Sequence, residues 1–392
     1  MTLEFDPRSP AFRRNPYPYY HMLRDAAPIF YWSTWGIFFL TRHDDCTELL
    51  RDNRLAHGNM GDPSAPQDAL AKMQSNWMLF KNPPDHTRLR SLVHKAFTPR
   101  MVEQLRTVIQ TITDNLLDKV QATGQMDLIA DLAYPLPVTA IAEMLGIPEQ
   151  DRHTFHEWSD ALARSLDLTE EPTVYERANQ AAVTFTAYLR ELANQRRAEP
   201  RNDLLSALVA VEEAGDHLSE AELYGTCSLL LIAGHETTIN LIGNGTLALL
   251  QNPDQLRLLQ QNSALLKPAI EELLRYDSPV QMTSRLVMEG MEIRGQALAR
   301  GQQVSFMLGA ANRDPAVFAN PDALDITRKA NPHLAFGGGI HYCLGAPLAR
   351  MEGQIALETL LRRLPNLALA TGLPVYRDNY VLRGLETLPV TF

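Results

Sequence analysis

The chain has 392 residues, of which 45% are hydrophobic and 21% charged, and this ordinary globular composition excludes disordered, collagen-like and coiled-coil proteins. Its formal net charge of -10 argues against a nucleic-acid-binding protein, because such proteins neutralise phosphates through a basic surface. The three cysteines lie far apart and have neither zinc-finger nor disulfide-framework spacing. We therefore expect a cytoplasmic protein.

Helical periodicity dominates the chain, and prolines and glycines interrupt it without a long linker or an internal repeat. Helices are expected at Met101–Val120, Ser219–Gln251, Lys267–Tyr276 and Leu348–Arg363, and short strands at Ile37–Thr41, Ser284–Ile293, Gln303–Leu308 and Tyr380–Phe392. The sequence thus predicts a mainly α protein with small β-sheets. The most apolar run, Cys227–Ala233, is too short to cross a bilayer, so we expect no membrane association.

The segment Met60–Pro84 is rich in proline, aspartate, glycine and asparagine, which predicts a loop. It nevertheless contains Trp77, Met78 and Phe80. A loop with this much apolar surface is expected to cover another part of the molecule.

The long central helix has a well-defined beginning and end. Ser219 and Glu222 form a capping box, and Asn252-Pro253 marks the end of the helix. A helix from Glu220 to Gln251 is about 48 Å long at the usual rise per residue, which is enough to cross a domain. We therefore expect its middle to be buried.

The middle of this helix carries Ala233-Gly234-His235-Glu236-Thr237-Thr238. Glycine disfavours a helix interior by up to about 1 kcal/mol relative to alanine, so its presence indicates that something is accommodated there. A carboxylate and two hydroxyls supply proton donors and acceptors beside this space. The alternative is an ordinary close crossing of two helices, with Glu236 ion-paired elsewhere.

A second motif, Phe336-Gly337-Gly338-Gly339-Ile340-His341-Tyr342-Cys343-Leu344-Gly345, comes directly before a predicted amphipathic helix, Ala346–Arg363. The helix N-terminus favours a thiolate at Cys343, and a thiolate is a nucleophile or a metal ligand. His341 is close enough in sequence to serve as the base of a nucleophile. A phosphate loop is disfavoured because no Lys-Ser/Thr pair follows the glycines, and the remaining alternative is a glycine turn with an inert cysteine.

The segment Phe336–Gly345 resembles the cysteine-ligand loop of the cytochrome P450 family of haem-thiolate monooxygenases, and Ala233–Thr238 resembles the oxygen-activation motif of the same family. The resemblance implies one domain over residues 1–392 with the cytochrome P450 fold, whose long central helix crosses over the haem, and it favours the soluble bacterial type. It also implies that Cys343 is the axial ligand of the iron in haem b.

The family has a Glu-x-x-Arg pair on a helix, and four pairs in this sequence have that spacing. Glu272/Arg275 is the one that lies between the two motifs. By resemblance, Glu272, Arg275 and Arg328 form a buried network that supports the cysteine loop. The resemblance also implies that haem contacts come from His86, Arg90, Ala233, Arg285, Phe336, His341 and Gly345, of which His86, Arg90, Arg285 and His341 are expected to hold the propionates.

This resemblance implies a monooxygenase that inserts one oxygen atom from dioxygen into an apolar, medium-sized substrate by hydroxylation or epoxidation. Thr237 is expected to hydrogen-bond the oxygen above the haem, and Glu236 to relay protons. Electrons are expected from a ferredoxin-type donor with its reductase, which would dock near the basic residues Arg88, Lys95 and Arg100.

The family positions predict a mostly aliphatic substrate pocket, lined by Met78, Leu229, Ile232, Ala233 and Val280. Such a lining favours a terpenoid, fatty acyl, steroid or macrolide-like skeleton. Two other functions stay open. One is a haem peroxygenase that uses peroxide directly, and the other is a non-catalytic haem-thiolate sensor of gas or redox state; the Glu236-Thr237 pair argues against both.

Overall fold

The computed structural model describes residues 6–7, 9–58, 68–165, 171–213, 218–370 and 374–392. The chain divides into two compact units. The first unit comprises Met1–Ala56, Thr113–Tyr134 and Thr237–Phe392, and the second comprises His57–Ile112 and Pro135–Glu236. Helices dominate both units, so the predicted mainly α fold with small sheets is confirmed.

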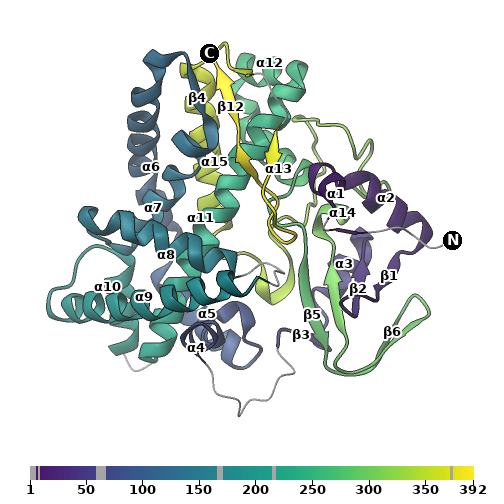
Figure 1. Ribbon diagram of the computed structural model, residues 1–392, viewed down its shortest axis with the longest axis horizontal. Coiled ribbons are helices and arrows are strands. Elements are labelled where there is room, and N and C mark those ends of the chain that lie inside the picture. Colours follow the sequence, from purple (N-terminus) through teal and green to yellow (C-terminus); the bar gives the residue numbers. More distant parts are fainter. Residues whose placement is uncertain (1–5, 8, 59–67, 166–170, 214–217, 371–373) are drawn as a thin grey trace. The chain divides into compact units, whose positions relative to one another are not determined.

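The second unit is helical throughout its described part. Its helices are α4 (Ala69–Ser75), α5 (Asp85–Ala96), the first part of α6 (Pro99–Val120), α7 (Pro135–Leu145), α8 (Arg152–Arg164), α9 (Pro172–Ala198), α10 (Leu204–Glu213) and the first half of α11 (Glu220–Gln251), with the short turns η1 (Met78–Phe80) and η4 (Glu149–Asp151). Helices α8 and α9 lie side by side (Figure 1). The Phe155 and Phe185 rings meet edge to face between them, with centroids 5.9 Å apart.

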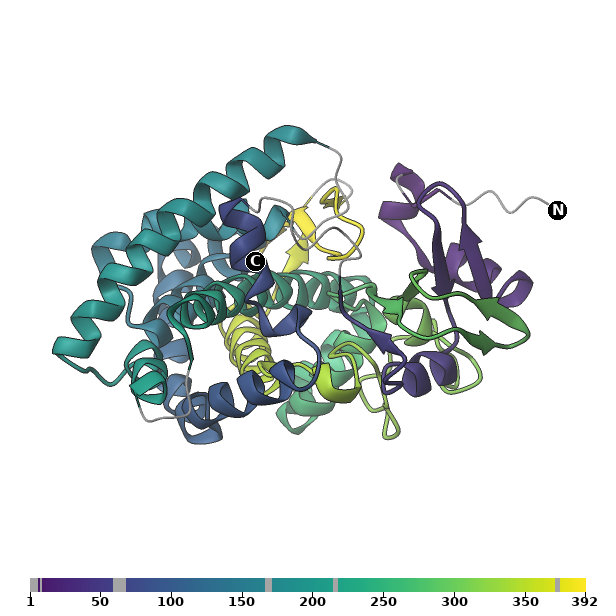
Figure 2. The ribbon, with the colours of Figure 1, turned by 90° about the horizontal axis from the view of Figure 1, so that it is seen from below.

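The first unit is built around a five-stranded sheet of order β1-β2-β8-β5-β3, formed by β1 (Ile29–Trp32), β2 (Ile37–Leu40), β8 (Gln303–Phe306), β5 (Thr283–Val287) and β3 (Leu55–Ala56). Figure 2 shows the purple strands of this sheet beside the green ones. Only β2 and β8 pair in parallel among these strands. Both have largely apolar inner residues, as expected for strands in the middle of a sheet.

The rest of this unit consists of helices and smaller sheets. Three small sheets pair β12 (Pro389–Thr391) with β4 (Gln125–Asp127) and β9 (Ala368–Leu369), β6 (Met291–Ile293) with β7 (Gln296–Leu298), and β10 (Val375–Tyr376) with β11 (Leu385–Thr387). The helices are α1 (Pro10–Arg14), α2 (Tyr17–Ala26), α3 (His43–Leu49), α12 (Pro253–Gln261), α13 (Leu266–Tyr276), α14 (Leu308–Ala311) and α15 (Ala346–Arg363), with the turns η2 (Gln121–Thr123), η3 (Ile129–Ala133), η5 (Ser263–Leu265) and η6 (Gly339–His341).

Helix α11 has the bounds that the sequence predicts, Glu220–Gln251, over 32 residues. Its capping box is formed: the Ser219 amide donates to Glu222 Oε2 at 2.8 Å, and the Glu222 amide donates to Ser219 Oγ at 3.3 Å. Among the helices of the described residues, none combines the length and the apolar character that a bilayer crossing requires.

The predicted loop Met60–Pro84 is wrong in part, because α4 and η1 lie within it, while residues 59–67 are outside the described part of the chain. Helix α4 begins where the Asp68 carboxylate accepts from the Ala71 amide at 2.9 Å. The predicted strand Ser284–Ile293 is two strands, β5 and β6, because the chain bends at residues 288–290 between them.

Removing the hydroxyl of Ser219 is expected to destabilise the protein by about 1 kcal/mol, because the Glu222 amide then loses its side-chain acceptor. The measurement is the urea midpoint of Ser219→Ala. Ser263→Ala, in the short turn η5, is the control and should leave the midpoint unchanged. Equal midpoints for all three proteins would show that the capping box contributes nothing.

Candidate active site

The loop from Phe336 to Gly345 holds Cys343 close to the N-terminus of α15. The Cys343 amide donates to the Phe336 carbonyl at 3.0 Å, which closes the loop. Gly345 is the N-cap residue of α15, and a proline follows in the first turn. Cys343 is half-buried and forms no disulfide. The loop therefore presents a single partly accessible sulfur at the start of a helix.

The shape of this loop depends on its glycines. Gly337 and Gly339 have φ values of 69° and 64°, in the left-handed region that disfavours other residues. A Cβ atom on Gly339 would lie 2.3 Å from the Leu50 carbonyl oxygen, so no side chain fits at this position. The loop is thus moulded against the C-cap of α3, where Leu50 lies.

A cluster of charged residues, here called the Glu271 clamp (Glu271, His333 and Arg350), packs against the loop. Arg350 donates to the two carboxylate oxygens of Glu271 at 2.7 and 2.8 Å, and its guanidinium lies 4.5 Å from the centre of the Phe336 ring. Burial favours a higher pKa for Glu271, but hydrogen bonds from His333 and Arg350 outweigh it and lower the pKa to about 2. Glu271 therefore stays ionised near neutral pH, and the clamp joins α13, α15 and the loop.

The predicted support residues come together at a second carboxylate. Glu272 accepts from Arg275 Nε at 2.8 Å and from Arg328 Nε at 3.0 Å. The side chains of Glu272 and Arg275 are completely buried. Arg275 also donates to the carbonyls of Asn312, Pro321 and Ala323, at 2.7 to 3.0 Å. This network ties α13 to the irregular segment that leads into the cysteine loop.

An open stripe runs along the middle of α11, although most of this helix is buried. Ala233 is exposed, and Leu230, Gly234 and Thr237 are half-buried. Their spacing of three and four residues places them on one face of the helix. A Cβ atom on Gly234 would lie 2.5 Å from Ile141 Cδ1, so this glycine allows α7 to pack closely. Ala233 and Thr237 thus offer a small side chain and a hydroxyl toward open space.

The other predicted site residues occupy different environments. On α5, His86 is buried and Arg90 half-buried; in the first unit, Arg285 is buried on β5 and His341 is half-buried in η6. Among the predicted pocket residues, Met78, Leu229 and Ile232 are buried, whereas Val280 is half-buried and forms an isolated bridge with Leu382. Ile232 is only 1% exposed, and Leu230 lies on the open stripe in its place.

The family model described as cytochrome P450 matches residues 13–367 of this chain. The chain belongs to the cytochrome P450 family. It is 44% identical over 395 residues to the biotin biosynthesis cytochrome P450 of Bacillus subtilis (strain 168), with 100% of both chains covered.

Two solved structures are also similar to this cytochrome P450. One is a cytochrome P450 in complex with an acyl carrier protein ligated to hexadec-9Z-enoic acid, with a TM-score of 0.93, 44% identity and coverage of 98% of this chain and 100% of the other. The second is a myxobacterial cytochrome P450 in complex with myristic acid, with a TM-score of 0.91, 42% identity and coverage of 98% of both chains. The predicted family and enzyme class are confirmed: the protein is a haem-dependent monooxygenase of this family.

Arg285 tests whether the residues present fit a haem. It is only 6% exposed, and its guanidinium donates to neutral groups, the Thr283 hydroxyl at 3.1 Å and the Ser284 carbonyl at 2.8 Å. Burial lowers its pKa to about 10, and no carboxylate of the described residues forms an ion pair with it. A buried cation of this kind requires an anion, which a haem propionate supplies. Together with the accessible sulfur of Cys343, it fits a haem.

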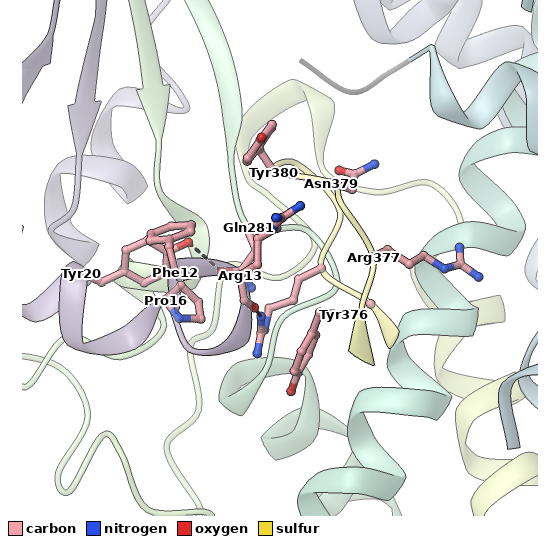
Figure 3. A pocket seen from close by; sticks show the side chains of 11 residues that line it. Phe12, Arg13, Pro16, Tyr20, Gln281, Tyr376, Arg377, Asn379 and Tyr380 are labelled. Carbon is pink, nitrogen blue, oxygen red and sulfur yellow. Dashed lines mark hydrogen bonds between the residues drawn. The ribbon is translucent and has the colours of Figure 1, made fainter. Parts of the chain in front are cut away.

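A separate pocket of about 320 Å³, part of it open to solvent, lies in the first unit among the side chains shown in Figure 3. Its lining includes Phe12, Tyr20 and Gln281, and Tyr20 donates to Gln281 Oε1 at 2.8 Å. Arg383, also in the lining, donates to Asp277 at 2.6 Å. Tyr20, Gln281 and Arg383 are thus already hydrogen-bonded, and none of the predicted site residues lines this pocket.

Neither the Glu271 clamp nor a buried carboxyl group on α15 was predicted from the sequence. Glu352 is fully buried and lies close to Thr238. Burial raises the pKa of Glu352 to about 8, so this carboxyl group is mostly protonated at pH 7. The order A-R-x-E after the cysteine loop was a possible signal, but sequence alone does not show which carboxylate is buried.

We expect Arg285→Met to bind haem more weakly by about tenfold, because a charge-assisted hydrogen bond to a propionate is lost. The haem-free variant should be more stable than the haem-free parent, since an unpaired buried cation is gone. Transfer of haem to apomyoglobin and urea unfolding of the haem-free proteins measure the two effects. Arg300→Met, at an exposed arginine, is the control. If haem transfer were unchanged, Arg285 would not be a haem-binding residue.

Glu352 should make stability depend on pH. Its folded pKa of about 8 exceeds the reference value of 4.5, so the folded protein holds a proton that the unfolded chain releases. The free energy of unfolding therefore falls between pH 4.5 and 8, by up to about 1.4 kcal/mol per pH unit. Glu352→Gln should stabilise the protein more at pH 8 than at pH 5, as measured by urea midpoints. Glu358→Gln, exposed on the same helix, should show no such difference.

Proposed function

We propose that this cytochrome P450 inserts one oxygen atom from dioxygen into an apolar, medium-sized substrate by hydroxylation or epoxidation. The observation that carries the proposal is the open stripe on α11, where a small residue and a hydroxyl face open space beside the Glu236 carboxyl group. We further propose that residues 1–392 act as one domain in the cytoplasm.

The cofactor in this proposal is haem b, whose iron Cys343 would bind. Phe336, Gly345 and Ala233 would contact the haem, and His86, Arg90, Arg285 and His341 would hold its propionates. Support comes from the buried Arg285, which needs an anion, and from the loop closed by the Cys343 amide. Glu272, Arg275 and Arg328 hold that loop from behind.

Haem bound through a thiolate supplies the activation of dioxygen. The chain itself has to exclude water, orient the substrate and deliver protons. In our proposal the Thr237 hydroxyl offers one hydrogen bond on the open side of α11, and the adjacent Glu236 carboxyl group takes protons from solvent and passes them on. Glu236 is suited to this task because it is only 8% exposed and its carboxyl group lies close to the His235 ring.

Within the apolar class we propose a fatty acyl chain as the substrate. The predicted lining residues Met78, Leu229, Ile232 and Val280 are unbranched or aliphatic and carry no charge that would bind a polar substrate. Two of the similar structures contain fatty acids. Terpenoid, steroid and macrolide-like compounds are the competing substrates. A titration that follows the shift in haem spin state separates these classes before any product is sought.

For the electron donor we propose a ferredoxin-type protein with its reductase. Lys95 and Arg100 are exposed around the end of α5 and could contact an acidic partner, whereas Arg88 is ion-paired with Glu222. Such docking depends on charge and weakens as salt rises. Charge reversal at Lys95 and Arg100 should therefore slow reduction by ferredoxin most strongly at low salt.

We expect Cys343→Ser to lose the absorption that a thiolate-ligated ferrous haem shows with carbon monoxide, because a serine hydroxyl does not provide a thiolate. Cys227→Ala, at a buried cysteine on α11, is the control and should keep the spectrum of the parent. A parent-like spectrum from the serine variant would refute the ligand assignment. Product formation with reductant and dioxygen, with peroxide alone, or with neither then distinguishes the monooxygenase from a peroxygenase and from a sensor.

Thr237→Ala and Glu236→Gln should each lower the amount of product formed per electron pair, because protons arrive too slowly and reduced oxygen is released instead. A loss of about tenfold or more is expected from the removal of one proton-transfer group. The measurement compares product with the reduced nicotinamide consumed. Thr246→Ala on the same helix, whose hydroxyl bonds only to the Ile242 carbonyl, is the control. Full product yield in both variants would overturn these two roles.

A further inference from the structure

Helix α8 carries a stripe of polar residues that runs from solvent into the protein. His153, His156 and Ser159 are spaced three residues apart, so each is rotated by about 60° from the one before, and together they lead from the exposed to the buried side of the helix. The side chain of His153 is 88% exposed, His156 is half-buried and Ser159 is completely buried. Two histidines and a hydroxyl in this order are unusual on a face that packs into a helical unit, because apolar residues would fill it more favourably.

The inner end of the stripe meets α11 at His235. The Ser159 hydroxyl lies 3.1 Å from Nδ1 and 3.2 Å from Nε2 of this buried ring. His235 Nδ1 also lies 2.7 Å from the Leu231 carbonyl oxygen. A carbonyl only accepts hydrogen bonds, so Nδ1 carries the proton in the neutral ring and Nε2 has the free electron pair. Nε2 lies 3.7 Å from Oε2 of Glu236, which is the next residue in the proposed relay.

We propose that His156, Ser159 and His235 form the proton entrance of Glu236, an inference that rests on the proposed function of Glu236. A proton from water at the surface enters at His156. His156 gives a proton from its other ring nitrogen to Ser159 Oγ while the hydroxyl proton of Ser159 moves to His235 Nε2, and the resulting His235 imidazolium gives that proton to Glu236. One proton enters, one proton reaches the Glu236 carboxylate, no electrons move, and His235 returns to its neutral form.

The charged surroundings keep the entrance neutral between transfers. Burial, followed by the neighbouring rings of His235 and His153 and the guanidinium of Arg152, lowers the pKa of His156 to about 4. At neutral pH this ring therefore has one nitrogen that accepts a proton and one that donates, so it passes protons on and does not store them. The titratable or charged groups nearest the stripe are Arg152, His153, Glu157 and Asp160 of α8, Glu143 of α7, Tyr188 of α9, and His235 and Glu236 of α11.

A purely structural role for these residues makes a different prediction. If Ser159 and His235 only packed α8 against α11, their replacement would lower stability without changing how protons reach Glu236. If the stripe is a proton entrance, the replacements should also lower the amount of product formed per electron pair. This loss should become larger for residues closer to Glu236. The exposed His153 gives a matched control on the same helix, because bulk water readily replaces an exposed side chain.

The first experiment uses the haem-loaded protein with its electron donors and compares Ser159→Ala, His156→Gln, His235→Gln and the control His153→Gln. Ser159→Ala and His235→Gln should form about tenfold less product per electron pair, with a larger solvent deuterium isotope effect, and His156→Gln should fall between them and the unaffected control. Turnover with hydrogen peroxide, which brings its own protons, should be largely retained. Full coupling in Ser159→Ala, which removes only one oxygen atom, would overturn the proposal even if His235→Gln failed to fold.

The second experiment does not depend on activity. Mass spectrometry of hydrogen exchange at the imidazole C2 position reports the titration and the solvent access of each histidine. His156 should titrate near pH 4, and its pKa should rise in His235→Gln, because one of the charges that lowers it is gone. An unchanged titration of His156 would show that the two rings are not coupled, which refutes the entrance.

Failure of this inference is distinguishable from failure of the proposed function. If Glu236→Gln loses coupling while the three stripe variants keep it, Glu236 is a relay residue and the entrance lies elsewhere. If Glu236→Gln itself remains fully coupled, the proposed relay is wrong and the stripe has no proton acceptor to serve.

Discussion

The structure of the cysteine loop depends on one buried carboxylate, that of Glu272. A carboxylate without solvent is very unfavourable unless its oxygens are satisfied, and here two arginines, the Asp325 amide and the Asn331 side chain all donate to it. Three of these donors come from the irregular segment before the loop. This segment has almost no regular secondary structure of its own, so the carboxylate takes the place of a helix or sheet in fixing its course.

The Glu271 clamp adds a second, more exposed restraint next to the first. Because Glu271 and Glu272 are adjacent on α13, their side chains point to different faces of this helix, and each holds a different part of the chain. Glu272 fixes the segment that precedes the loop, and Glu271 fixes α15, the helix that follows it. The sulfur of Cys343 is thus positioned from both sides by charges anchored on a single helical turn.

Much of the fold was predictable because its signals are local. The capping box at Ser219 and the Asn-Pro stop define α11 within the sequence itself, and the predicted bounds are those observed. The helix α4 was missed although Asp68 provides an N-cap, because the prolines and glycines before it dominate the composition of that segment. The break between β5 and β6 was missed because continuous β-forming residues do not show where pairing changes partner.

The residues of the site likewise fall into those that the sequence predicts and those that it does not. Cys343, Glu236 and Thr237 stand out in the sequence because unusual residues cluster around them. Contacts that join distant segments have no such signal: Leu50 against Gly339, Arg350 on Glu271 and Ser159 at His235 are separated by long stretches of chain. Spacing on α8 could have drawn attention to His153, His156 and Ser159, but only the fold shows that this face ends at the residue before Glu236.

The close approach of Gly339 to the Leu50 carbonyl links two segments that lie far apart in the sequence. During translation Leu50 leaves the ribosome long before Gly339 and the arginine that completes the clamp. The surface against which the loop is moulded is therefore synthesised well before the loop itself. It follows that the loop acquires its sulfur-bearing geometry only once the segment around Gly339 has been made and has reached the C-cap of α3.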